Sequence, residues 1–322
     1  MSVLSEYIDH FSRLRQDHNQ ERYPTTTLQA SPHKPLLLLA VVDRFAEGSI
    51  EENRIPLDPA LGDPFSEYWR AVMPIDHPPN IALPFYHLTS EGFWHLIPSP
   101  GHENVVESGR RLRSTRLLHE HTDGARLDDS LFELMQNEED REPLRRTLIE
   151  TYFAEDVHEV LYEKGHVHEK AYRYSRRLLD LVQSEETAEV DEPEAHVRDK
   201  GFRRVVVEAY DHRCAVSGIR ILTADAHTAV DAAHIVPWSE SHNDDPRNGI
   251  ALNKLCHWAF ENGLITISPE YTIRTSSELT ASYNTTGMLD TLDGRSPHLP
   301  EEDALWPDPE YLEQHRENIF RK

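Results

Sequence analysis

The chain has 322 residues, and its 57 acidic and 33 basic side chains give a formal net charge of −24 at pH 7. This charge excludes a protein that attracts nucleic acid through its overall field, because a strongly negative surface repels DNA phosphates. The sequence contains no run near the ~18 apolar residues of a membrane span and no signal-peptide pattern at its start, so we expect a cytoplasmic protein without a membrane segment.

Apolar residues at helical spacing predict several helices in the first half of the chain. The predicted helices cover residues 4–14, 34–45, 65–72, 131–153 and 172–182. Two short strands are expected at 82–88 and 92–97, joined by a Thr-Ser-Glu-Gly turn. Because nothing resembles alternating βαβ units, the pattern indicates an α+β fold dominated by helices.

A carboxylate-rich stretch without aromatic residues follows at 183–195 and is typical of a solvated linker. A chain of this length is expected to form about two domains. We therefore predict a first domain over residues 1–182, an acidic linker over 183–200 and a second domain over 201–322.

The second domain is predicted to contain two helices, one extended segment and a terminal hairpin. The helices are expected at 201–210 and 252–261, the extended segment at 230–235, and the hairpin at 264–268 with 271–274. This order places an extended segment, a loop and a helix in succession, which is the arrangement that a ββα-metal site needs.

Three motifs follow one another in this domain: Val230-Asp-Ala-Ala-His234-Ile-Val-Pro237, Asn248-Gly-Ile-Ala-Leu252 and Cys256-His257-Trp-Ala-Phe-Glu261. They resemble the HNH (ββα-metal) endonucleases. The resemblance implies that His234 is the general base, that the amide of Asn248 pins the loop between strand and helix, and that His257 binds the metal ion. Phosphodiester hydrolysis needs such a base and a cation that neutralises the scissile phosphate.

Glu261 lies four residues after His257, so the two side chains share one helix face and are expected to bind one Mg²⁺ or Mn²⁺ ion. An ordinary surface carboxylate is the alternative for Glu261. Many relatives carry Asp directly before the base histidine, where this chain has Ala233. Asp231 is the nearest replacement, but residues 231 and 234 of a regular strand face opposite sides, so its role as a metal ligand requires a bulge.

The acidic and histidine side chains between the base and the central asparagine are expected to be solvated turn residues and not ligands; they are His242, Asp244 and Asp245.

Many HNH proteins also hold a structural zinc ion with two Cys-x-x-Cys pairs. The corresponding places here are Cys214-Ala-Val-Ser217 and Asn253-Lys-Leu-Cys256, so each pair keeps one cysteine. Structural zinc needs four nitrogen or sulfur ligands. We therefore predict no structural zinc and two buried, reduced thiols.

The first domain contains Ser31-Pro-His33-Lys34-Pro35, followed by Leu83-Pro84-Phe85. Over about 150 residues it resembles the sulfur-binding domain of restriction enzymes that depend on phosphorothioate DNA. The resemblance implies a shallow apolar pocket for the sulfur atom, with His33, Lys34 and Pro84 as DNA contacts. Leu83 stands where the family usually has Tyr.

An arginine-rich stretch could supply base contacts in this otherwise acidic protein. Its candidate residues are Arg110, Arg113 and Arg116. The alternative is that these arginines only form a solvent-exposed surface without a DNA contact. Among the basic residues only six are lysine, which together with the acidic excess is typical of salt-adapted proteins. Halophilic origin is thus one hypothesis, and an acidic mesophilic protein with a local basic cleft is the other.

The resemblances together imply a modification-dependent (type IV-like) restriction endonuclease that acts on phosphorothioate-modified double-stranded DNA with a divalent metal ion. A homodimer would provide the two nuclease sites that a double-strand break requires. Two other interpretations remain open. One is an HNH enzyme that reads another modification or plain sequence, and the other is a modified-DNA-binding protein that has lost turnover.

Overall fold

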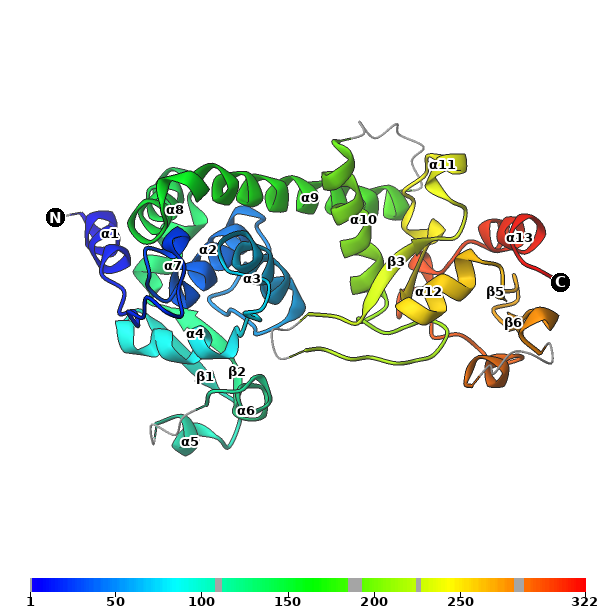
Figure 1. Cartoon of the computed structure of the whole chain (residues 1–322), viewed down its shortest axis with the longest axis horizontal. Helices are drawn as coiled ribbons and strands as arrows, with labels where there is room; N and C mark the ends of the chain where they lie inside the picture. The colour runs from blue at the N-terminus through cyan, green and yellow to red at the C-terminus, as the bar shows by residue number, and fades with distance from the viewer. Residues whose placement is uncertain (1, 108–111, 185–192, 224–226, 281–286) are drawn as a thin grey trace. The chain divides into compact units, whose positions relative to one another are not determined.

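The computed structural model describes residues 2–107, 112–184, 193–223, 227–280 and 287–322. It divides into two compact units, Met1–Glu169 with Leu222–His227, and Lys170–Ile221 with Thr228–Lys322. The long helix α9 (His158–Ser184) contributes residues to both units (Figure 1). No helix among the described residues is both long and apolar enough to cross a membrane.

The division between the units falls at Glu169, inside α9, and not in the acidic stretch from which we predicted the linker. Residues 185–192 of the predicted linker lie outside the described residues. Helix α10 (Ala195–Ala209) begins within the remaining part of the predicted linker.

The first unit is built around α2 (His33–Ala46), which is buried along almost its whole length. A helix that is apolar all round needs partners on every side. They are α3 (Pro59–Val72), α4 (Ala82–His87), α7 (Asp129–Gln136) and α8 (Glu138–Tyr152), and α1 (Val3–Ser12) packs against α7 and α8. The helix-dominated α+β class predicted from the sequence is confirmed.

The strand predicted at 82–88 is wrong, because these residues form α4 and continue into a 3-10 turn, Leu88–Glu91. Pro84 lies in the first turn of α4, where its missing N–H costs no helical hydrogen bond. The strand expected at 92–97 does exist as β1 (Trp94–Pro98), but it pairs antiparallel with β2 (Thr122–Leu127). The hairpin predicted within residues 82–97 is therefore replaced by a sheet with a distant partner.

The single helix predicted at 131–153 is interrupted, and forms α7 and α8. The break falls at Asn137, whose side chain accepts a hydrogen bond from the backbone N–H of Glu139 and so caps α8. Asparagine is a favoured N-cap because its side-chain oxygen satisfies a backbone donor that the helix leaves unpaired.

A buried ionic network connects the helices of the first unit. Asp43 on α2 is fully buried and accepts hydrogen bonds from Tyr68, Arg145 and His168. Burial alone would raise the pKa of Asp43, but the charges and hydrogen bonds of Arg145 and His168 lower the pKa below its ordinary value. The network thereby joins α2, α3, α8 and the first part of α9.

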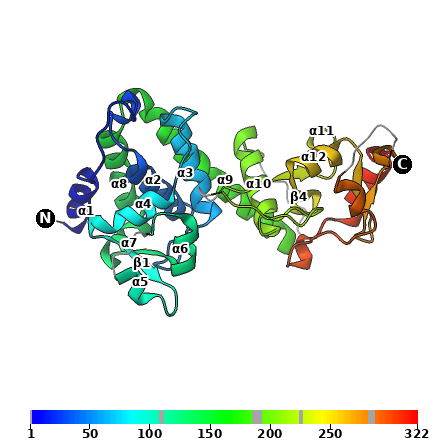
Figure 2. The ribbon, with the colours of Figure 1, turned by 60° about the horizontal axis from the view of Figure 1, so that its bottom comes forward.

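The second unit centres on a hairpin of β3 (Val230–His234) and β4 (Gly249–Asn253), in which His234 lies opposite Gly249. Helix α10 packs closely on this hairpin, since a Cβ atom at Gly249 would lie 2.3 Å from Val206. Helix α12 (Lys254–Glu261) follows β4 directly and lies beside β3 in Figure 1 and beside β4 in Figure 2. The helix predicted at 252–261 therefore starts two residues later than expected.

The hairpin predicted at 264–274 is confirmed as β5 (Ile265–Ile267) paired antiparallel with β6 (Ile273–Thr275). The last helix, α13 (Pro309–Asn318), packs against β5 and completes the core of this unit. Its His315 is buried and stacks on Phe260 of α12, with ring centroids 3.8 Å apart.

Candidate active site and DNA-contact residues

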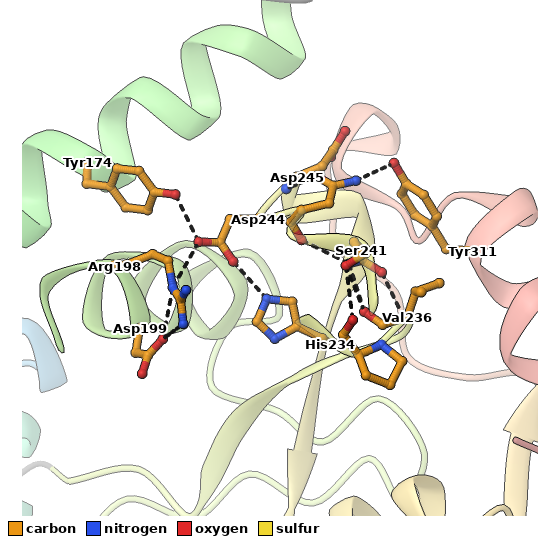
Figure 3. A network of polar contacts seen from close by, with 12 residues as sticks. Tyr174, Arg198, Asp199, His234, Val236, Ser241, Asp244, Asp245 and Tyr311 are labelled. Atoms are coloured by element: carbon orange, nitrogen blue, oxygen red, sulfur yellow. Dashed lines mark hydrogen bonds and ion pairs between the residues drawn. The ribbon is translucent and has the colours of Figure 1, made fainter. Parts of the chain in front are cut away.

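His234 ends β3, and its side chain is fixed from two directions. Its Nε2 atom lies 2.8 Å from Oδ1 of Asp244 (Figure 3). The ring also stacks face to face on Phe202 of α10, with centroids 4.0 Å apart and planes at 4°. The side chain keeps 19% of its surface exposed. It is thus oriented by its neighbours and still reachable from solvent.

Asn248 is completely buried and ties together the two ends of the loop between β3 and β4. Its Oδ1 atom accepts a hydrogen bond from the backbone N–H of Val236 at 2.9 Å. Its Nδ2 atom donates to the carbonyl oxygens of Val236 at 3.2 Å and Asn243 at 3.0 Å. The amide therefore closes the loop that leaves His234, and its contribution to catalysis stays a prediction.

Asp244 is not the solvated turn residue that we expected from its place in the loop; that prediction is wrong. Its side chain is only 2% exposed, and Oδ2 accepts a hydrogen bond of 2.9 Å from the Tyr174 hydroxyl. Arg198 lies within ion-pair distance, with Nε 3.7 Å from the same oxygen. Asp245 next to it caps a 3-10 turn and binds Arg247. Nothing in the sequence distinguishes the two neighbouring aspartates.

Helix α12 brings two of the predicted metal ligands together. Nε2 of His257 lies 3.1 Å from Oε1 of Glu261, and the two side chains are 24% and 63% exposed. Between them, Trp258 projects into solvent with 55% of its surface exposed. The described residues contain no cluster of three or more His, Cys, Asp or Glu side chains arranged to hold a metal ion.

Asp231, the third predicted metal ligand, lies on the face of β3 opposite to His234. The β3–β4 register is continuous from Val230 to His234, so the strand lacks the bulge that a ligand role requires. The Oδ1 atom of Asp231 instead accepts a 2.8 Å hydrogen bond from Nε of Arg203. Ala233, where many relatives have Asp, is buried in the core of the unit.

The two cysteines are buried free thiols, and Ser217 and Asn253 lie beside them. The Ser217 backbone N–H points at Sγ of Cys214, and the Asn253 amide donates to the Ser217 hydroxyl at 2.9 Å. A hydrogen bond with Cys256 is the main cause that holds the pKa of Cys214 below its ordinary value. Hydrogen bonds thus connect all four positions.

The predicted DNA contacts of the first unit start at the N-terminal end of α2. His33 hydrogen bonds to Ser31 at 2.8 Å and meets the Trp69 ring edge to face. Burial, with smaller effects of the Arg22 and His87 charges, lowers the pKa of His33 to about 4. The ring is therefore neutral at pH 7.

Lys34 is largely buried, and its ammonium group pairs with the carboxylate of Glu91 and donates to the Ser90 hydroxyl at 3.2 Å. Both partners lie in the turn that directly follows α4, the helix that carries Leu83 and the buried Pro84. The start of α2 and the α4 region are thereby held together.

Of the three candidate arginines, Arg110 lies outside the described residues. Arg113 is exposed, and Arg116 is 84% exposed with the Glu120 carboxylate 4.0 Å away. Both side chains are available to solvent.

Two family models match this chain. Residues 5–169 match the ScoMcrA-like DNA sulfur-binding domain, and residues 214–268 match the HNH endonuclease family. Among solved structures, a "Modification dependent TagI restriction endonuclease" is similar, with 26% sequence identity and a TM-score of 0.30. The match covers 40% of this chain and 41% of that one, so it spans less than half of either protein. The curated proteins contain no match.

Proposed function

The chain belongs to the ScoMcrA-like DNA sulfur-binding family and carries an HNH endonuclease domain, and from this we propose that it is a modification-dependent restriction endonuclease. Its substrate would be phosphorothioate-modified double-stranded DNA, hydrolysed near the modification with a divalent metal ion. The observation that carries the proposal is the oriented, solvent-accessible His234 within a domain of a nuclease family. We propose that the enzyme meets this substrate in the cytoplasm.

For recognition, the proposal uses the start of α2 and the neighbouring α4. Sulfur in place of a phosphate oxygen is larger, softer and less hydrated, so an apolar rim with a nearby cation can prefer it. Pro84 and Leu83 would supply the rim, and His33 and Lys34 would contact the backbone. Because Lys34 already pairs with Glu91, its attraction for an ordinary phosphate is reduced, which leaves more of the discrimination to the apolar contacts.

For hydrolysis, His234 would accept the proton of the attacking water, while Asn248 keeps the loop behind it closed. His257 and Glu261 offer a nitrogen and a carboxylate oxygen on one partly exposed helix face, which fits a divalent ion that completes its shell with water and phosphate oxygens. When bound there, Mg²⁺ or Mn²⁺ supplies stabilisation of the charge on the phosphate and the leaving oxygen.

A second candidate function is a modified-DNA-binding protein without turnover. It is favoured by Ala233, which is buried in the core where many relatives have an acidic ligand, and by Asp231, which is paired with Arg203. The two ligands on α12 would then be too few to support cleavage.

Incubation with modified and unmodified plasmids, with Mn²⁺ or with EDTA, distinguishes these functions. We expect cleavage of the modified plasmid alone, and only with the metal ion. Equal cutting of both plasmids would instead indicate an HNH enzyme that does not read phosphorothioate, and binding without cutting would support the second candidate.

His234→Ala should abolish cleavage and leave the affinity for modified DNA unchanged, because the variant removes the proposed base and no proposed DNA contact. Gel-shift and cleavage assays on the same preparation measure both properties. Retained cleavage would refute the assignment of His234.

A double-strand break needs two cuts, and we propose that two copies of the chain provide them. Light scattering of the protein with and without modified DNA tests this assembly.

A further inference from the structure

The carboxylate of Asp244 is buried beside His234, and the side chains around it are groups that can donate hydrogen bonds. It accepts a hydrogen bond from Tyr174 at 2.9 Å, lies 2.8 Å from Nε2 of His234, and faces Nε of Arg198 at 3.7 Å (Figure 3). A buried charge is tolerated only when it is paired and hydrogen-bonded. The positive charge of Arg198 and the hydrogen bond from the Tyr174 hydroxyl both stabilise the ionised form of the Asp244 carboxylate.

The charge on Asp244 decides which nitrogen of His234 carries the proton. An ionised carboxylate only accepts hydrogen bonds, so Nε2 of His234 must be the donor. A neutral imidazole has one N–H, which leaves Nδ1 with a free lone pair. Among the described residues, no hydrogen bond reaches Nδ1 of His234. Nδ1 is thus the nitrogen that can accept a proton from water.

The plane of the His234 ring is fixed as well, mainly by side chains of α10. Phe202 covers one face of the His234 ring, and Arg198, four residues earlier on α10, lies near Asp244. Residues at this spacing share a helix face. Arg198 also stacks 3.8 Å from the centroid of Trp238, whose ring lies 6.0 Å from that of His234. The direction of the Nδ1 lone pair therefore follows from the packing of α10.

We propose that Asp244 is a positioning residue that selects the Nε2–H tautomer of His234 and so makes Nδ1 the catalytic base, and that Tyr174 holds Asp244 in this role. The catalytic part rests on the proposed nuclease function. The tautomer itself does not, because it is a property of the folded protein without DNA.

The tautomer is measured directly by long-range ¹⁵N–¹H spectra of the full chain labelled on histidine, with the His234 signals identified by their loss in His234→Ala. The wild type should show the Nε2–H form. Asp244→Asn should give a mixture or the Nδ1–H form, because an amide can accept from or donate to the ring. Asp245→Asn is the matched control and should leave the His234 signals unchanged. An Nδ1–H wild type, or an unchanged Asp244→Asn spectrum, would overturn the proposal.

Cleavage kinetics test the consequence for catalysis. Asp244→Asn should lower kcat by roughly 100-fold, within the range that general-base catalysis contributes, while KM stays near the wild-type value at a temperature where melting curves show the variant to be folded. Asp245→Asn should retain wild-type kcat. Equal losses in both variants, or a loss confined to KM, would contradict a positioning role.

Tyr174→Phe removes only the hydroxyl that holds Asp244 and should lower kcat about 10-fold, as expected for one hydrogen bond to a charged group. Tyr172→Phe on the same helix is its control, because that ring lies under Arg204 and not at Asp244. Unaltered kcat in Tyr174→Phe would remove Tyr174 from the proposal. If the wild type cuts no DNA, the proposed function fails, and the histidine spectra still decide the tautomer.

Discussion

At the scale of single residues, we predict that the pairing of Lys34 with Glu91 determines how strongly the first unit binds DNA phosphates. Lys34 is the proposed backbone contact, yet its charge is neutralised inside the protein and only 11% of its side chain is exposed. A cation in this state adds little to binding of ordinary DNA. Its availability is therefore controlled by Glu91.

We predict that Glu91→Gln tightens DNA binding and steepens its salt dependence, because it releases Lys34 to one phosphate. One added phosphate contact should increase the slope of log K against log salt by about 0.9. Fluorescence anisotropy at several salt concentrations measures both effects. Asp9→Asn, which removes the surface partner of Arg13, is the control for a change in net charge alone. An identical slope in the two variants would argue against Lys34 as a DNA contact.

His315 makes the stability of the second unit dependent on pH. Its Nε2 donates to the Phe260 carbonyl and its Nδ1 accepts from Thr266, so the neutral ring is satisfied. Burial lowers its pKa from 6.5 to about 4. The unfolded chain thus binds the proton first, and the contribution of His315 to stability is present above pH 6.5 and is lost as the pH falls towards 4.

The expected loss between these pH values is on the order of 3 kcal/mol. Urea unfolding at pH 7 and pH 4.5 measures it, and His315→Gln should show a smaller decrease than the wild type even though the variant is less stable at pH 7. Equal decreases would mean that other groups cause the acid sensitivity.

At the scale of elements, the close contact of α10 with β4 depends on a glycine. A methyl group at position 249 would lie 2.3 Å from Val206 and 3.0 Å from the Phe202 ring that stacks on His234. We predict that Gly249→Ala costs about 1–3 kcal/mol, as overpacking of a core does. Relief of this overlap would displace α10 and the Phe202 ring, so kcat should also decrease. Thermal unfolding and cleavage assays check the two effects, and a variant with full stability and activity would show that α10 can move without consequence.

The sequence predicted most helices and the β5–β6 hairpin, because long apolar periodicities and turn residues are local signals. The prediction was wrong where packing against a segment distant in the sequence decides which secondary structure forms. Residues 82–88 are short and apolar enough to suit strand or helix, and their packing against α2 selects α4. Asn137 ends one helix and caps the next, although the apolar pattern runs through it.

The residues of the candidate site also fall into those that the sequence indicates and one that only the structure reveals. His234, Asn248, His257 and Glu261 could be chosen from motif and spacing alone. Asp244 could not, because its partners Tyr174 and Arg198 lie on α9 and α10, far away in the sequence. Long-range contacts of this kind carry no sequence spacing by which to recognise them.

At the scale of the whole molecule, each unit has its own core of buried apolar side chains. The first unit adds the ionic network around Asp43, whose carboxylate is fully buried. Removing one member of such a network leaves the others without compensation. The network is therefore a point at which the first unit can be weakened selectively.

We predict that Asp43→Asn destabilises the first unit by about 3–5 kcal/mol, because it leaves Arg145 buried without its partner charge. Calorimetry of the full chain should show a lower transition for the first unit and little change in that of the second. A small shift would mean that water or Glu142, which also binds Arg145, takes over the pairing.

The exposed Trp258 gives the protein a built-in optical probe on α12, the helix that carries the proposed metal ligands. Trp69 and Trp94 are buried, and Trp238 and Trp306 are only partly accessible. Most of the emission that acrylamide can quench should therefore come from Trp258, which neighbours His257. Shielding of that emission by a modified oligonucleotide would report arrival of DNA at α12 in real time, without a dye and without cleavage.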